Sequence, residues 1–234
     1  GGGKFASTVS SDGYVVKYDK DGKYLWHHSV TTTNVTYSNQ RLTVDTSDNI
    51  VALGVHKGDV DFGAGPVTAI GDTRSWLMKL DKAGKLVWGS AIGSSKSDGY
   101  SQAVALVTNP QGQIYVTGLF IDGEMVFDGQ TFNYAGFAQD VFLMRLDPMG
   151  KLEIGKRYGD FLSQYGDGIA LDPAGNVWLS GTFNGSLNFG GGDLPNLSDQ
   201  NQGVVFTDVY VAKFDKDLKH IASKAYGPFN APRL

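Results

Sequence analysis

One eight-residue motif occurs four times in this chain, and its repetition limits the fold more than any other feature. In each copy a base follows an aromatic residue by three positions, and an aspartate follows the base by two. Successive copies begin 62, 66 and 68 residues apart. The copies are DGYVVKYD (12–19), RSWLMKLD (74–81), DVFLMRLD (140–147) and DVYVAKFD (208–215). A period of this length indicates a repeat architecture.

The composition favours β-structure. The 234 residues include 32 glycines, with 41% hydrophobic residues, and few long helix-forming runs, which is typical of many short strands joined by tight turns. A net charge of −4, with both signs interspersed, gives no reason to expect nucleic acid as a partner. The chain has no cysteine, which excludes disulfides and thiolate chemistry. No apolar run approaches the roughly 20 residues of a transmembrane helix.

Each whole unit is predicted to contain strand, turn, strand, glycine-rich loop, strand, turn and strand. Turn sequences such as DKAGK, NPQGQ and DPAGN separate the strands, with proline or glycine where a tight turn requires its geometry. In the last turn, DKDLK, Leu218 replaces the glycine, so we expect strain or remodelling there. The predicted divisions are a half blade of two outer strands (1–30), three blades (31–93, 94–159 and 160–227) and a tail leading to a next blade (228–234).

The strand patterns predict sheets that are apolar on both faces. In NVWLSGTF, for example, Val177 and Leu179 face one way and Trp178 the other. A lone four-stranded sheet of this kind must be covered on both sides, and stacking successive sheets around an axis achieves this. The predicted fold class is therefore all-β, a β-propeller of four-stranded antiparallel blades with about 3.5 blades in this chain.

Two further positions recur in register. A glycine ends each second strand, which predicts a bulge or a close backbone approach from a neighbouring sheet; these are Gly54, Gly118 and Gly181. A phenylalanine follows each of these strands after a short gap and is predicted to lie between adjacent sheets; these are Phe62, Phe127 and Phe189.

The first hairpins of the type DPAGNVWLSGTFNG, the NFGGG loops and the DVYVAKFD strands resemble the bacterial β-propeller repeat family called SBBP, for seven-bladed β-propeller. The resemblance covers essentially the whole chain and is strongest in residues 169–215. It is weakest in the first unit, where DTSDN lacks proline and glycine and Arg74 replaces the leading aspartate. The resemblance implies a bacterial secreted, cell-surface or periplasmic protein with a binding role, and it implies no reaction.

About three and a half blades do not close a ring. One interpretation is a fragment of a roughly seven-bladed propeller whose missing blades belong to the same chain. The other is a ring completed by a second copy, since twice three and a half is seven. The sequence leaves both open.

The charged residues of the repeated motif have two interpretations each. The aspartates could bind calcium or accept hydrogen bonds from turn N–H groups, and the second is favoured because DKAGK and DPMGK each offer only one carboxylate. No cofactor is therefore predicted. The bases could line a central channel for an anionic ligand or make structural pairs at the blade edges, and the structural interpretation is favoured. The residues are Asp19, Asp81, Asp147, Asp215, Lys17, Lys79, Arg145 and Lys213.

The sequence contains no recognisable catalytic constellation. Its four histidines, His27, His28, His56 and His220, stand at non-equivalent positions without the spacing of a zinc site. There is no GxSxG motif, and the glycine clusters at 63–65 and 190–192 are not followed by GK[ST].

Two loops differ between units while the strands around them do not. These are FNYAGFA (132–138) and PNLSDQNQGVVF (195–206). Variable loops on a rigid scaffold commonly carry binding specificity, although the aromatic residues of the first loop could instead pack under the next blade. The candidate binding residues are Phe132, Tyr134, Phe137, Asn196, Asp199 and Gln202.

We therefore predict a non-enzymatic binding or scaffold module that contacts a protein or a glycan through its variable loops. One alternative is a propeller-based lyase or hydrolase with its site at the channel mouth. The other is a structural spacer in a surface assembly.

Overall fold

The computed structural model describes residues 13–33, 36–68, 71–133, 138–194 and 207–227. All regular secondary structure within these ranges is β-structure, in agreement with the predicted all-β class. The same residues include no helix that could cross a lipid bilayer.

The first two sheets differ in size. The two long strands of the first are β1 (Gly13–Tyr18) and β2 (Tyr24–Thr32), which pair antiparallel. The second has four long antiparallel strands in the spatial order β3, β4, β7, β8. Its strands are β3 (Thr36–Val44), β4 (Ile50–His56), β7 (Arg74–Leu80) and β8 (Leu86–Ser94).

The third and fourth sheets repeat the plan of the second. Strands pair antiparallel in the orders β9, β10, β13, β14 and β15, β16, β19, β20. The third sheet comprises β9 (Tyr100–Thr108), β10 (Ile114–Ile121), β13 (Asp140–Leu146) and β14 (Leu152–Tyr158). The fourth comprises β15 (Gln164–Leu171), β16 (Val177–Phe183), β19 (Asp208–Phe214) and β20 (His220–Tyr226). The predicted four-stranded antiparallel sheets are thus confirmed.

Each glycine-rich loop contains a short hairpin that the sequence analysis assigned only as loop. The hairpins are β5 (Val60–Asp61) with β6 (Pro66–Val67), β11 (Met125–Phe127) with β12 (Gln130–Phe132), and β17 (Leu187–Asn188) with β18 (Asp193–Leu194). The first two extend the preceding sheet, because β5 pairs with β2 and β11 pairs with β8. Successive units are therefore joined by backbone hydrogen bonds as well as by packing.

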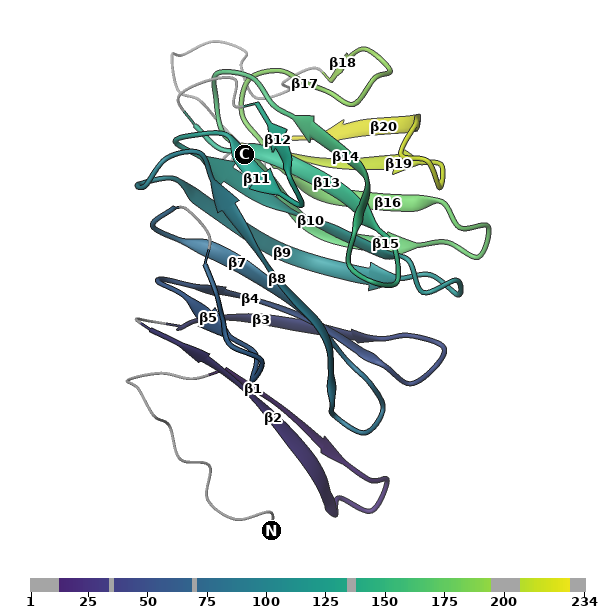
Figure 1. The fold of residues 1–234 in the computed structure, drawn as a ribbon. Helices are drawn as coiled ribbons and strands as arrows, with labels where there is room; N and C mark the ends of the chain where they lie inside the picture. The colour runs from purple at the N-terminus through teal and green to yellow at the C-terminus, as the bar shows by residue number, and fades with distance from the viewer. Residues whose placement is uncertain (1–12, 34–35, 69–70, 134–137, 195–206, 228–234) are drawn as a thin grey trace, which may run out of the picture.

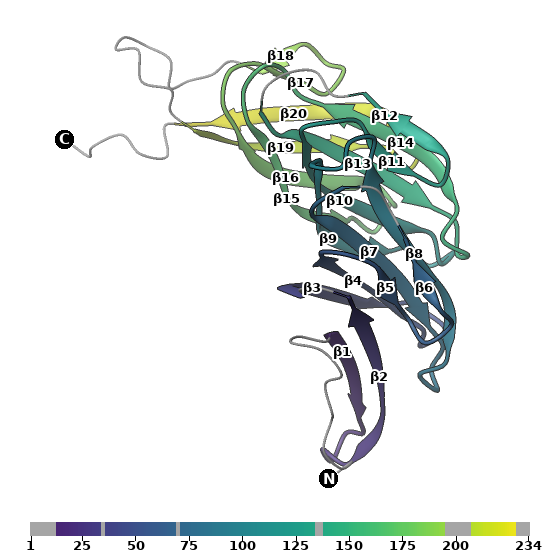
Figure 2. The ribbon, with the colours of Figure 1, turned by 60° about the vertical axis from the view of Figure 1, so that its left-hand side comes forward.

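The four sheets lie face to face in a curved stack. Figure 1 shows the order, from β1 and β2 in purple to β19 and β20 in yellow. Figure 2 shows that the stack curves without bringing its first and last sheets together. The arrangement of the sheets is propeller-like, and the tight turns of the sheets lie along one side, on the right of Figure 1. We call this side the turn end.

The hydrophobic core is divided into three layers, one between each pair of successive sheets. Val15 of the first sheet packs with Trp76 of the second, and Leu77 of the second packs with Phe142 of the third. The phenylalanines predicted to lie between sheets are buried in these layers: Phe62 in the first, Phe127 in the second and Phe189 in the third. Each layer removes large apolar side chains from water, and this burial is the main stabilising contribution.

Burial distinguishes the middle sheets from the last one. Every residue of β4 is buried, and so is every residue of β10 except Ile121. In β16, which occupies the equivalent position, buried residues alternate with partly exposed ones. The reason is that the second and third sheets are covered on both faces, whereas in the described structure the fourth is covered on one.

Two of the recurrent glycines, Gly118 and Gly181, mark bulges, which is the first of the two predicted alternatives. The register shifts at Gly118 and opposite Gly181, which is the signature of a β-bulge. A side chain at Gly118 would overlap the carbonyl of Gln102, and one at Gly181 would overlap the carbonyl of Tyr165. Both carbonyls belong to the first strand of the same sheet, so the close approach occurs within a sheet.

Candidate functional site at the turn end

Seven tight turns at the turn end share one hydrogen-bonding plan. The side-chain oxygen of the first turn residue accepts hydrogen bonds from the backbone N–H groups two and four positions later. In the turn that begins at Asp81, these donors are Ala83 and Lys85, both at 2.9 Å. The first residues are Asp19, Asp45, Asp81, Asn109, Asp147, Asp172 and Asp215. The motif aspartates therefore organise the turns that follow their strands.

Leu218 adopts the same turn geometry as the glycines that it replaces. Its φ is 56°, and its N–H donates to the Asp215 carbonyl at 3.0 Å, so the turn is not remodelled. At the equivalent turns, Gly84 lies against the indole of Trp26 and Gly150 against that of Trp88, which leaves no room for a side chain. In the third interface, Ile154 takes the place of the tryptophan, and Leu218 is buried in the same core layer.

Three bases of the repeated motif, Lys79, Arg145 and Lys213, pair with turn carboxylates. The Lys79 ammonium lies 3.0 Å from Asp45 Oδ2, and these side chains are only 6% and 4% exposed. Lys213 makes the equivalent pair with Asp172 at 2.9 Å, with side chains 23% and 20% exposed. Burial raises the pKa of Asp45, but hydrogen bonds from Asn49 and Lys79 outweigh it and lower the pKa to about 2.

Three of the bases, Lys17, Lys79 and Arg145, also reach the next sheet. In three interfaces, the base and an aromatic N–H or O–H group of one sheet donate to a single carbonyl of the next. We call this arrangement a carbonyl clamp. Its acceptor is always the residue after the motif aspartate. The clamps are Lys17 and Trp26 on the Lys82 carbonyl (3.3 and 3.2 Å), Lys79 and Trp88 on that of Pro148 (3.3 and 3.2 Å), and Arg145 and Tyr115 on that of Lys216.

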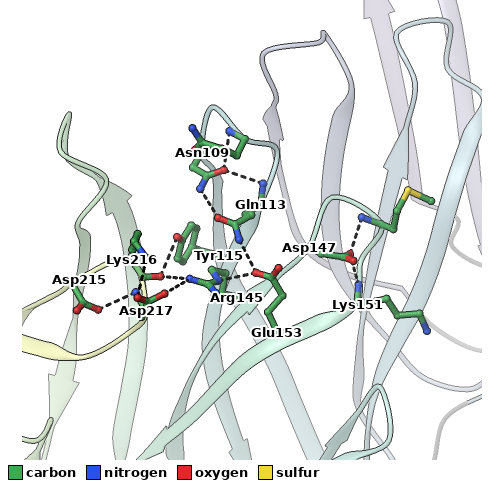
Figure 3. Close-up of polar contacts among 12 residues, drawn as sticks. Asn109, Gln113, Tyr115, Arg145, Asp147, Lys151, Glu153, Asp215, Lys216 and Asp217 are labelled. Carbon is green, nitrogen blue, oxygen red and sulfur yellow. Dashed lines mark hydrogen bonds and ion pairs between the residues drawn. The ribbon is translucent and has the colours of Figure 1, made fainter.

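The third clamp lies within a wider polar network (Figure 3). Arg145 pairs with Glu153 at 2.8 Å and with Asp217 at 3.0 Å. Gln113 donates to the same Glu153 carboxylate at 2.6 Å and accepts from Asn109 at 2.8 Å. Burial lowers the pKa of Arg145, but the hydrogen bonds to Asp217 and Glu153 outweigh this effect and raise it overall.

A cleft opens beside this network, between the first turns of the third and fourth sheets. Its volume is about 460 Å³, and its lining includes Gln111, Gln113, Pro173 and Lys216. The corresponding turns of the second and third sheets are in direct contact, because the Thr46 hydroxyl donates to the Pro110 carbonyl at 3.2 Å. Pro110 occupies the position of Thr46 in the next turn and has no hydroxyl to donate. The bond that joins the preceding pair of turns therefore has no counterpart at Pro110, where the cleft lies.

The charged groups around this cleft, which we call the turn cleft, are held in pairs. Asp172 accepts from Asn176 and Lys213, and these contacts lower the pKa of its carboxyl group. The Lys216 ammonium lies 2.9 Å from Asp217, whose pKa is lowered by Lys216 and by Arg145. The amides of Asn109 and Gln113 are bonded within the network, which leaves the Gln111 amide, backbone groups and proline rings for a ligand. This chemistry suits hydrogen bonding to a neutral polar molecule.

The candidate binding residues of the variable loops are not brought to this cleft. Phe132 is buried in the core layer between the second and third sheets and lies against Gly155 of β14. Its burial favours the packing alternative for this residue. The other five candidates lie outside the described residues; they are Tyr134, Phe137, Asn196, Asp199 and Gln202.

Sequence reasoning missed the turn cleft and the aromatic donors of the clamps. The signal for the cleft was the pair of prolines, Pro110 and Pro173, in two consecutive first turns. His56 is buried at the position that Phe120 and Phe183 occupy in the next two sheets. Among the described residues, no three histidine, aspartate or glutamate side chains form a group that could hold a metal ion. No protein-family model matches the chain, and no curated protein matches its sequence.

Proposed function

We propose that this chain is a non-enzymatic binding module and that the turn cleft holds a neutral glycan. The observation that carries the proposal is the chemistry of the cleft, which offers the Gln111 amide, backbone groups and proline rings while its nearby ions are paired with one another. Its volume of about 460 Å³ falls within the roughly 300 to 1,000 Å³ that is usual for small-ligand sites. A neutral polyhydroxy ligand would use such groups without having to compete with the ion pairs.

We further propose that the stack is part of a roughly seven-bladed β-propeller of the SBBP type. The propeller-like stacking of four sheets and the repeated motif support this proposal. The resemblance would place the protein outside a bacterial cell, on its surface or in the periplasm. In this setting, a rigid stack of sheets would present the turn cleft and the variable loops to partners.

The test is binding to an array of immobilised neutral oligosaccharides. Pro110→Thr should abolish binding, because a hydroxyl at this position can close the cleft onto the Pro173 carbonyl as Thr46 does in the preceding pair of turns. Gln111→Ala should weaken binding about three- to tenfold, since one neutral hydrogen bond contributes about 0.5–1.5 kcal/mol. Gln130→Ala, an exposed amide on β12, is the matched control and should bind like the wild type.

Other outcomes would contradict the proposal in different ways. Shortening of a bound oligosaccharide would indicate the lyase or hydrolase alternative. If the wild type and Pro110→Thr captured a partner protein equally well, the binding surface would have to lie outside the cleft. If the protein bound neither glycans nor proteins, the spacer alternative would remain.

A further inference from the structure

The outward face of the fourth sheet carries the donors of a fourth carbonyl clamp. Lys213 occupies the position of Lys17, Lys79 and Arg145 in the repeated motif. Its ammonium lies 4.8 Å from the centre of the Trp178 ring, and Trp178 occupies the position of Tyr115, the aromatic donor of the third clamp. Base and aromatic donor are therefore side by side, as in the three complete clamps.

The ion pair between Lys213 and Asp172 is one of the two contacts that the equivalent base, Lys79, makes in the second sheet. In the second sheet, the Lys79 ammonium contacts Asp45 and, at the same time, the Pro148 carbonyl of the next sheet. An ammonium group has three N–H donors, so Lys213 can likewise hold Asp172 and a carbonyl together. The greater exposure of the Lys213 pair, 23% and 20% against 6% and 4%, corresponds to the missing cover of a following sheet in the described structure.

The apolar residues of this face point to the same conclusion. Trp178 is 39% exposed, whereas Val51 and Tyr115 at the equivalent positions are fully buried. Tyr226 is half exposed, whereas its equivalents Val30 and Ile92 are also fully buried. These positions are buried in every described interface between successive sheets, and the fourth sheet leaves them in contact with solvent.

The first sheet presents the complementary half of the contact. Its turn has the geometry of the other acceptor turns: Asp19 accepts from Asp21 and Lys23, and Gly22 has a φ of 77°. The Lys20 carbonyl therefore stands where the carbonyls of Lys82, Pro148 and Lys216 stand in the complete clamps. On the outward face of the same sheet, Tyr18 is 53% exposed at the position where Leu80, Leu146 and Phe214 are fully buried.

We infer that the outward face of the fourth sheet docks onto the first sheet of a second copy of this chain. Lys213 of one copy donates to the Lys20 carbonyl of the other. The Trp178 N–H, which donates to Asp172 at 3.4 Å in the single chain, exchanges this bond for the same carbonyl. Val211 packs between the sheets as Leu77 and Leu143 do in the internal layers. The two surfaces differ, so the contact is heterologous and each copy carries both halves. Association is head to tail and gives a closed ring or a longer assembly.

The experiment measures the mass of the full chain by light scattering across a concentration series. The wild type should rise from one chain to a multiple of it. Val211→Glu removes the fourth-sheet half of the contact, and Tyr18→Glu removes the first-sheet half; each alone should weaken association at least about tenfold, as expected for changes at the centre of an interface. Val87→Glu makes the same kind of change at an exposed site on β8 and should associate like the wild type.

A mixture of Val211→Glu and Tyr18→Glu gives the sharpest readout. One intact half remains on each variant, so the mixture should form a two-chain complex and nothing larger. A second pair of variants tests the clamp: Lys213→Met should weaken association, and Lys213→Arg should preserve it, because arginine fills this role at position 145. These two also replace the glutamate variants if circular dichroism shows that a glutamate variant does not fold.

Three results would overturn the inference. The wild type could stay monomeric at every concentration. Tyr18→Glu could associate like the wild type, which would mean that the first sheet takes no part. The mixture could remain monomeric although each variant folds. None of these results bears on the turn cleft, which lies between the third and fourth sheets of a single chain.

Discussion

At the residue scale, equivalent positions in successive sheets explain the unusual side chains. His56 stands where the next two sheets have phenylalanine, and it is as deeply buried as they are. Burial lowers the pKa of His56, and the positive charge of Arg74 lowers it further, to about 4 despite an opposing effect of Asp59. The folded state thus keeps this imidazole neutral, whereas the unfolded chain protonates it near pH 6.5.

The free energy of unfolding should therefore fall as the pH drops from about 6.5 to 4, because only the unfolded chain gains this proton. The depression of the pKa from 6.5 to about 4 corresponds to about 3 kcal/mol over the whole window. His56→Phe should remove this contribution, as measured by urea unfolding at a series of pH values. His27→Phe, at an exposed position on β2, is the control and should keep the wild-type slope. An unchanged slope in His56→Phe would contradict the assignment.

Leu218 and Ile154 form a second residue-scale pair, because the other interfaces combine glycine with tryptophan. Leu218→Gly should destabilise the protein by about 1–3 kcal/mol, since the lost packing exceeds the relief of left-handed strain. Ile154→Trp should cost about 1–3 kcal/mol through overpacking. The double variant should recover part of both losses, with a coupling of about 0.5–3 kcal/mol in a double-mutant cycle. Simple additivity of the two losses in urea unfolding would refute the pairing.

At the element scale, the turns determine how successive sheets meet. In each turn that begins with aspartate or asparagine, this side chain accepts hydrogen bonds from the turn backbone and so holds its conformation. Where such a turn follows a motif strand, one of its carbonyls accepts hydrogen bonds from the preceding sheet. The second clamp is the most buried of those with an ion pair, through Lys79 and Asp45. Removing one partner of a buried pair leaves the other charge uncompensated.

Lys79→Met should therefore lower the free energy of unfolding by about 3–5 kcal/mol. It should also weaken the acid sensitivity due to Asp45, whose depressed pKa stabilises the fold above about pH 4 and stops doing so as the pH falls towards 2. The matched control is Lys17→Met, which loses a contact with the Lys82 carbonyl and one with the Trp26 ring and should cost about 1 kcal/mol. Equal losses in urea unfolding would contradict the assigned role of the ion pair.

The elements also show how far the sequence could be read. The strands, the turns and the phenylalanines between sheets could be predicted, because their hydrophobic and turn patterns recur at equivalent positions of each unit. The side hairpins did not, because two- and three-residue strands such as β5 and β11 carry too little pattern. The clamps could not be found by alignment, because their aromatic donor comes from the last strand in Trp26 and Trp88 and from the second strand in Tyr115. The turn cleft lies where Pro110 has no hydroxyl to donate to the next turn. This becomes visible only when the turns are seen side by side in the structure.

At the scale of the whole molecule, the core layers of the described residues lie between neighbouring sheets. In a stack of this kind each core layer adds to the stability. The two outermost faces carry the same kinds of residue that are buried in the interior layers. The middle sheets are buried on both faces, whereas the fourth alternates between buried and exposed residues. The same repetition that specifies the interior therefore also specifies what the ends present to solvent.

The pairing of β5 with β2 and of β11 with β8 has a consequence for how such a chain can grow or be shortened. The repeating segment of the sequence and the hydrogen-bonded sheet do not coincide, because the first and second sheets are each extended by a hairpin of the segment that follows. A gene cut after residue 94 would encode a β8 whose Gly93 and Ser94 had lost Val126 and Met125 as partners. Duplication of whole segments, by contrast, restores every such pairing except the last.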